Sequence, residues 1–278
     1  MPIGVFDSGV GGLTVMEALR RCLPHEDYIY LGDTARLPYG TKSRSSIVQY
    51  SIQAADLLVQ QGIKCLVVAC NTASSVALEA LKERFSPLPV LGVVEPGAEA
   101  GCSVSSGGRI AVIATESTVR EGAYQRAIAR RRPNAIVTAR ACPLFVALAE
   151  EGWNNGPIAM AVAHRYLDDL FAQHSPDTLV LGCTHFPVLS AVLQAVAGPR
   201  VALVDSAATT ARALEDLLRA RALLQPQVKS GSLRLLATDG PERFARVGTL
   251  FLHQALSASD VQLVDLGVRP QGAHTAGA

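Results

Sequence analysis

Two similar segments, LVVACNTASS at residues 66–75 and LVLGCTHFP at residues 179–187, constrain this chain more than any other feature. Each is a short apolar run that ends in a cysteine and is followed by polar residues. An apolar run of this length, bounded by turn residues, is typical of a buried parallel strand. Cys70 and Cys183 are therefore predicted at the carboxyl ends of strands, where open α/β sheets bind their ligands.

Strands and helices are expected to alternate along the rest of the chain, as they do in α/β proteins with mostly parallel sheets. Strands are predicted at residues 3–6, 28–31, 64–69, 90–93, 109–114, 135–139, 178–182, 201–204, 233–237 and 261–264. Helices are predicted after the glycines of residues 9–12 and at 44–61, 71–85, 118–131, 143–150, 159–173, 206–223 and 241–253. The predicted fold class is α/β.

The order of these elements repeats within the chain. Ser8 follows the first strand and lies 62 residues before Cys70, while Thr115 follows the strand at 109–114 and lies 68 residues before Cys183. Each interval ends in a strand, a cysteine and an expected helix. Matching order and spacing indicate an internal duplication that gives two pseudo-symmetric α/β domains.

The two predicted domains are discontinuous in the sequence. The strands at 233–237 and 261–264 cannot belong to a second half equal in size to the first, so we expect them to return and complete the first domain. The domains are then residues 1–95 with 208–278, and residues 96–207. The active site is expected in the cleft between them.

Composition and charge exclude several classes of function. The formal net charge is +1 without a charge-rich tail, which does not favour binding to nucleic acid or to a membrane surface. We expect no membrane span and no signal peptide, and hence a cytoplasmic protein. The glycines after Ser8 lack the spacing and the lysine of a nucleotide-binding loop. Residues 269–278 contain few core-forming side chains and are expected to fray.

The chain contains six cysteines, and their spacing bears on metal binding and on redox state. They form no CxxC pair and show no zinc-ligand spacing, so no metal site is predicted. In a reducing cytosol all six are expected to remain free thiols.

The chemistry of Cys70 and Cys183 depends on whether they act together. Unpaired N–H groups at a helix start favour a thiolate. A single cysteine beside a histidine, as at Cys183 and His185, would indicate a nucleophile. Two equivalent cysteines on facing halves instead favour a two-base racemase or epimerase, in which one thiolate removes a proton and the opposite thiol supplies one. Two unrelated buried cysteines are the competing interpretation, since buried cysteine is common.

Several longer segments resemble the glutamate racemases of the aspartate/glutamate racemase family. The matching segments are IGVFDSGVGGLTV (3–15), LGDTARLPYG (31–40), ACNTASS (69–75), EEGW (150–153) and LGCTHFP (181–187). The resemblance implies a cofactor-independent isomerase that interconverts L- and D-glutamate. It also implies a role in peptidoglycan biosynthesis, and thus in the bacterial cell wall and cell shape.

Carried over by position, the resemblance makes Cys70 and Cys183 the two acid/base residues. Cys70 would act on D-glutamate and Cys183 on L-glutamate, and Asp7 and His185 match the polar residues that assist them. Backbone N–H and hydroxyl donors at helix N-termini suit the two carboxylates of such a substrate. The residues that match substrate-binding positions are Asp7, Ser8, Tyr39, Gly40, Asn71, Thr72, Thr184 and His185.

A glutamate before a Gly-Trp pair also assists catalysis in the family. Here Glu150 and Glu151 are adjacent, and we favour Glu151 as the assisting carboxylate. Lys42 and Arg44, which follow the second matching segment, are interpreted as surface residues rather than ligands of the substrate.

Racemisation of aspartate or another amino acid is the nearest alternative, but the DSGVGG and CTH runs favour glutamate. A binding role of a different class is the second alternative, because some glutamate racemases are reported to inhibit DNA gyrase. The near-neutral charge and the presence of both cysteines favour catalysis.

The resemblance also implies a homodimer. Because the first strand begins at residue 3, we do not expect the activation by a peptidoglycan precursor that an N-terminal extension provides in some relatives.

Overall fold

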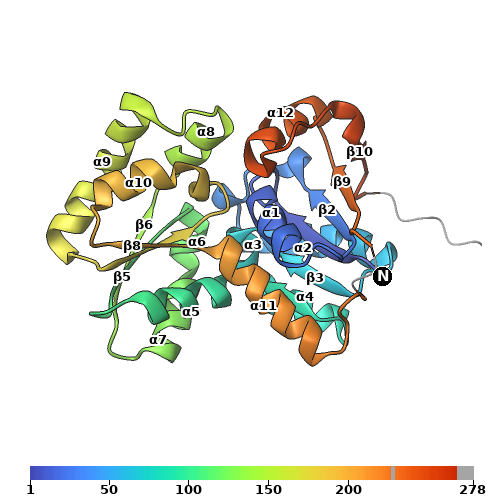
Figure 1. The fold of residues 1–278 in the computed structure, drawn as a ribbon, viewed down its shortest axis with the longest axis horizontal. Coiled ribbons are helices and arrows are strands. Elements are labelled where there is room, and N and C mark those ends of the chain that lie inside the picture. The colour runs from blue at the N-terminus through green and yellow to red at the C-terminus, as the bar shows by residue number, and fades with distance from the viewer. Residues whose placement is uncertain (227–228, 268–278) are drawn as a thin grey trace, which may run out of the picture.

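The computed structural model describes residues 1–226 and 229–267, so the expectation for residues 269–278 lies outside the described part. The described residues form two parallel sheets flanked by helices, which confirms the predicted α/β class (Figure 1). The larger sheet contains β1 (Ile3–Asp7), β2 (Tyr28–Gly32), β3 (Cys65–Val68), β4 (Val90–Gly92), β9 (Leu233–Ala237) and β10 (Val261–Leu263). The smaller sheet contains β5 (Arg109–Ala114), β6 (Ile136–Ala141), β7 (Thr178–Gly182) and β8 (Ala202–Asp205).

The two sheets share one strand order, as the internal repeat predicts. The smaller sheet runs β6-β5-β7-β8, and the larger runs β2-β1-β3-β4 with β9 and β10 added beyond β2. The strands pair in parallel throughout this order. Because β3 and β7 hold equivalent places, Cys70 and Cys183 leave their sheets at equivalent points. The late strands do join the larger sheet.

Helices cover both faces of each sheet and bury four apolar cores. On the larger sheet, one face carries α1 (Leu13–Cys22), α11 (Ser206–Ala220) and α12 (Pro241–Leu252), and the other carries α2 (Arg44–Gln60), α3 (Asn71–Val76) and α4 (Leu78–Phe85). On the smaller sheet, one face carries α5 (Val94–Val104) and α7 (Ala123–Arg131), and the other carries α8 (Leu144–Glu150), α9 (Gly156–His174) and α10 (Ser190–Ala197). Each large apolar side chain buried in these cores contributes about 1.5–3 kcal/mol.

Two of the expected helices are divided in the structure. The helix predicted over residues 71–85 breaks at Ala77 into α3 and α4, and the one predicted over 118–131 breaks into α6 (Glu116–Glu121) and α7. The second break occurs at Gly122, whose φ of 64° lies in the left-handed region that glycine adopts without strain. Helices α3 and α6 begin shortly after β3 and β5, at the carboxyl edges of the two sheets.

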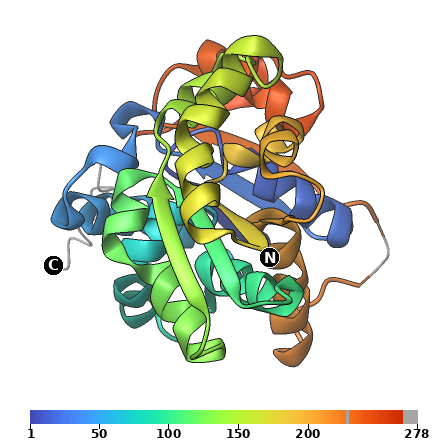
Figure 2. The ribbon, with the colours of Figure 1, turned by 90° about the vertical axis from the view of Figure 1, so that its left-hand side faces the viewer.

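The two halves meet through a few elements. Helix α11 packs against α1 of one half and α5 of the other, and α3 packs against α6. Figure 2, turned by 90°, places the smaller sheet in front with the larger one behind it. The carboxyl ends of β3 and β7 thus approach the boundary between the two halves. Within residues 1–226 and 229–267, no helix is both long and apolar enough to cross a membrane.

Candidate active site

One cavity of about 300 Å³ lies at the boundary between the two halves and contains both cysteines. This volume is at the lower end of the range of about 300–1,000 Å³ for small-molecule sites, as a compact substrate requires. The predicted site residues in its wall are Ser8, Tyr39, Gly40, Cys70, Asn71, Thr72, Cys183, Thr184 and His185. Segments more than a hundred residues apart therefore supply a single site.

Cys70 lies at the start of α3 and caps it with its own sulfur. The Ala73 N–H donates to Cys70 Sγ at 3.4 Å, and Sγ donates to Ser8 Oγ at 3.3 Å. Asn71 and Thr72 are the first two residues of the helix. Burial, and secondarily the charge of Asp7, raise the pKa of Cys70 to about 12. Cys70 is thus a thiol at neutral pH, a form that can donate a proton.

Cys183 has different surroundings. Strand β7 ends at Gly182, and the chain enters a 3₁₀ turn, η3 (Phe186–Leu189), with Pro187 in its first turn. The α-helix expected directly after Cys183 instead begins at Ser190 as α10. The polar partner of the sulfur is a side chain: Cys183 Sγ lies 3.8 Å from His185 Nδ1.

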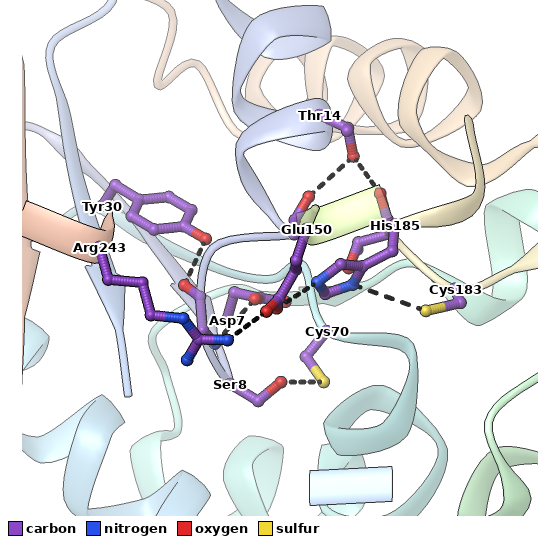
Figure 3. Close-up of polar contacts among 12 residues, drawn as sticks. Asp7, Ser8, Thr14, Tyr30, Cys70, Glu150, Cys183, His185 and Arg243 are labelled. Atoms are coloured by element: carbon purple, nitrogen blue, oxygen red, sulfur yellow. Dashed lines mark hydrogen bonds and ion pairs between the residues drawn. The ribbon is translucent and has the colours of Figure 1, made fainter. Parts of the chain in front are cut away.

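His185 is held between Cys183 and a buried carboxylate (Figure 3). Its Nε2 lies 3.0 Å from Glu150 Oε1, and Arg243 donates to Glu150 Oε2 at 2.5 Å. Burial alone would lower the pKa of His185, but its interactions with Cys183 and Glu150 outweigh burial and raise the pKa to about 10. The imidazole is therefore a cation at neutral pH, and its positive charge lies beside the Cys183 sulfur.

Glu150, rather than the favoured Glu151, is the carboxylate that contacts His185. Glu150 is only 9% exposed, whereas Glu151 is exposed and follows the last residue of α8. Burial would raise the pKa of Glu150, but the hydrogen bond to His185 and the positive charges of His185 and Arg243 lower it. Glu150 thus remains ionised beside His185, whereas the favoured Glu151 lies in solvent.

Asp7 is fully buried behind the loop that follows β1, and it does not line the cavity. The Gly9 N–H donates to Asp7 Oδ2 at 2.9 Å, and the buried Tyr30 hydroxyl donates to Gly9 O at 3.0 Å (Figure 3). Burial raises the pKa of Asp7, while the charge of His185 opposes this rise. Asp7 is therefore placed to fix the loop that carries Ser8.

The same loop and the first turn of α1 also contact the other half of the molecule. Thr14 Oγ1 donates to Thr184 O at 2.9 Å. A Cβ atom added at Gly11 would lie 2.4 Å from the His185 ring and 2.5 Å from Thr184 Oγ1. Only glycine permits this close approach of the loop to the turn that contains Cys183 and His185.

Replacing Gly11 with alanine is therefore expected to lower kcat/KM by about tenfold or more, because the new methyl group displaces His185. Initial rates and thermal unfolding measured on the same preparation would check this. Secondary structure and the unfolding transition should change less than the rate. A wild-type rate would show that the loop does not control the position of His185.

The residues of the cavity wall that were not predicted as site residues include Thr115, Glu116 and Arg243. Thr115 carried a signal, since the repeat aligns it with the start of the chain, and its Oγ1 lies 2.9 Å from Thr72 Oγ1 of the other half. Arg243 belongs to α12 and gave no signal in the sequence. Among the residues that the structure describes, no three His, Cys, Asp or Glu side chains gather to hold a metal ion.

Comparison with known proteins assigns the family. The family model described as Asp/Glu/Hydantoin racemase matches residues 3–214. The chain belongs to this family. A glutamate racemase of Geobacter metallireducens is 51% identical over 264 residues, which are 95% of this chain and 96% of that protein.

Two solved structures of the family share the whole fold. The glutamate racemase of Francisella tularensis in complex with D-glutamate is 37% identical, with a TM-score of 0.88 and coverage of 96% of this chain and 98% of that one. The glutamate racemase isoform RacE1 of Bacillus anthracis is 35% identical, with a TM-score of 0.91 and the same coverage of both chains. Both glutamate racemases thus share the architecture of this chain.

Proposed function

We propose that this chain interconverts L- and D-glutamate by a two-base mechanism that uses Cys70 and Cys183 and needs no cofactor. The observation that carries the proposal is that two cysteines, from equivalent strand ends of two pseudo-symmetric halves, line a single small cavity. The glutamate racemase relatives, one of them bound to D-glutamate, support glutamate as the substrate. An interface between two halves also offers a separate group to each face of a carbon atom.

In the direction from L- to D-glutamate, the Cys183 thiolate removes the α-proton, and the bonding electrons remain on the α-carbon. The Cys70 thiol then donates its proton to the opposite face of that carbon. The product is D-glutamate, with a thiol at Cys183 and a thiolate at Cys70. The reverse reaction begins from this state, or proton exchange with water restores the first one. No atom other than hydrogen is exchanged.

The two acid/base groups have unequal partners, which supports an order for these steps. The His185 cation lies 3.8 Å from Cys183, whereas burial raises the pKa of Cys70, so that Cys70 begins as a thiol. We propose that Glu150 assists through His185 and that Asp7 assists Cys70 through the loop that carries Ser8. This arrangement supports deprotonation of L-glutamate by Cys183 as the first step.

Several donors in the cavity wall suit the two carboxylates of glutamate. Tyr39 and Gly40 lie in the short turn η2 (Tyr39–Thr41), and Thr72 lies in the first turn of α3, where backbone N–H groups are unpaired by the helix itself. Ser8 and Thr184 add hydroxyl groups from opposite sides. We propose that these residues, with Asn71 and His185, hold the substrate so that its α-carbon lies between the sulfurs.

We propose domain limits of residues 1–95 with 208–278, and 96–207. A homodimer is supported by large apolar side chains that are more than half exposed on α8, α9 and the turn between them: Leu144, Trp153 and Ile158. Light scattering of the purified protein tests the dimer.

A cytoplasmic location is supported by six cysteines that are all free thiols. The same reaction would supply D-glutamate for peptidoglycan in a bacterial cell.

Circular dichroism of L-glutamate, L-aspartate and L-glutamine solutions tests the reaction and its substrate together. The signal of L-glutamate should decay to zero, and aspartate should react about 10–200-fold more slowly, because it lacks one methylene group. In deuterated water, the D-glutamate formed should carry deuterium at the α-carbon. Faster decay with aspartate would favour the alternative substrate. No decay with any amino acid would favour a binding role.

A further inference from the structure

Tyr124 is a buried residue that lies outside the cavity and yet contacts the turns that carry both cysteines. It is the second residue of α7, in the half that contains Cys183, and only 1% of it is exposed. Its hydroxyl donates to Asn71 Oδ1 at 2.7 Å. Asn71 directly follows Cys70 and belongs to the other half, so this hydrogen bond crosses the boundary beside one sulfur.

The ring of Tyr124 approaches the second cysteine. A Cβ atom added at Gly182 would lie 3.1 Å from Tyr124 Cε2, so the ring rests directly on the backbone that precedes Cys183. The ring is held from behind by α5, because a Cβ atom added at Gly97 would lie 3.1 Å from the tyrosine hydroxyl. One rigid side chain therefore spans from the residue before Cys183 to the residue after Cys70.

The partner of Tyr124 is fixed as well. Asn71 is 2% exposed, and its Nδ2 donates to Ser206 Oγ at 3.5 Å, at the start of α11. Both ends of the Asn71 amide thus have partners that belong to the protein. Although Asn71 lines the cavity, its side chain is engaged by Tyr124 and Ser206, which leaves its backbone to face a substrate.

We infer that Tyr124 is a positioning residue that sets the separation between the Cys70 and Cys183 turns. This inference rests on the proposed two-base function, which requires both sulfurs within reach of one carbon atom. The phenol ring suits this role because it has few rotatable bonds and is enclosed on both faces. Its hydroxyl fixes the Cys70 turn, and its ring fixes the Cys183 turn.

A loss of this spacing has a chemical signature. After one thiolate removes the α-proton, the carbanion is either protonated by the opposite thiol, which inverts the centre, or reprotonated by the first thiol, which does not. If the opposite thiol lies farther away, inversion slows and the intermediate lasts longer. The first thiol then has time to exchange with deuterated water and to return deuterium without inversion.

The experiment compares Tyr124→Phe with wild type in deuterated water. Proton NMR reports deuterium gained by the unreacted isomer, and circular dichroism reports racemisation. In Tyr124→Phe we expect kcat to fall about tenfold. We also expect a rise of about threefold or more in the exchange ratio, defined as the rate of deuterium exchange without inversion divided by the rate of racemisation. Tyr28→Phe is the matched control, since Tyr28 is a buried tyrosine whose hydroxyl donates to Leu19 O and Leu23 O, away from the cavity.

A second variant disturbs the contact from its other end. Gly182→Ala crowds the Tyr124 ring without removing its hydroxyl group, and it should raise the same ratio. The new Cβ would also lie 3.0 Å from Ile113 O, so thermal unfolding of this variant is measured alongside. The positioning role is overturned if Tyr124→Phe lowers exchange and racemisation in parallel, so that the ratio of the two rates is the same as in wild type and in Tyr28→Phe. If wild type itself fails to racemise glutamate, the proposed function fails instead. The two failures are thus distinguished within one data set.

Discussion

Replacing Cys70 or Cys183 with serine is expected to lower kcat/KM for glutamate racemisation by about 10²–10⁴-fold, the contribution typical of one acid/base group. This corresponds to about 3–5 kcal/mol of barrier. Both single variants should lose activity in both directions, because every turnover uses one sulfur to remove a proton and the other to supply one. Circular dichroism rates starting from each isomer would measure the loss.

Isotope effects should separate the two variants. With α-deuterated substrates, Cys183→Ser should enlarge the primary isotope effect on kcat/KM for L-glutamate, since the residue that breaks that carbon–hydrogen bond is weakened. Cys70→Ser should do the same for D-glutamate. Identical isotope effects in the two variants would contradict the assignment of one face to each cysteine.

Cys65→Ser is the matched control for these variants. Cys65 is a fully buried thiol in β3, the strand that leads to Cys70, and its side chain packs in the apolar core that β3 shares with α1. Burial raises its pKa to about 12, close to that of Cys70, so a high pKa alone does not distinguish the two. Activity per folded molecule should be unchanged in Cys65→Ser. A Cys70→Ser/Cys183→Ser double variant with the wild-type rate would contradict the two-base mechanism.

The positions of the two cysteines were predictable because they follow from local pattern. Apolar runs bounded by turn residues identify β3 and β7, and the carboxyl edge of a parallel sheet faces the ligand. The equivalence of Cys70 and Cys183 came from order and spacing, and the shared strand order of the two sheets confirms it. Local pattern could not give the different environment of each sulfur, since a 3₁₀ turn follows Cys183 where an α-helix was expected.

The choice between Glu150 and Glu151 lay beyond the sequence for a physical reason. Successive helix residues differ by about 100° in direction, so adjacent residues at the edge of a buried face are separated only by where the helix ends. Helix α8 ends at Glu150, which turns the side chain of Glu151 into solvent. Arg243 holds Glu150 through a hydrogen bond, and it lies 93 residues from Glu150 in the sequence. Only the return of the chain to the first half brings the two together.

Replacing Glu150 with glutamine is expected to lower kcat/KM by about 10²-fold, the scale of losing one preorganised electrostatic partner. Glutamine keeps the shape of the side chain and an oxygen near His185 Nε2, but it removes the negative charge that favours the imidazolium. Glu151→Gln is the matched control, since the adjacent carboxylate is exposed, and it should retain the wild-type rate. If Glu151→Gln showed the larger loss, the role would return to Glu151.

The pH dependence of the Glu150→Gln variant tests the same mechanism with a definite sign. In wild type, Cys183 and Glu150 outweigh burial and raise the pKa of His185 to about 10, so the imidazolium persists well above neutral pH. Without the Glu150 charge, burial is less opposed and the pKa of His185 must fall. The imidazolium is then lost at lower pH, and the alkaline limb of kcat/KM for L-glutamate should move toward neutrality. NMR titration of the His185 ring in both proteins should show the same displacement, whereas Glu151→Gln should titrate as wild type. An unmoved alkaline limb in Glu150→Gln would show that Glu150 does not act through the charge of His185.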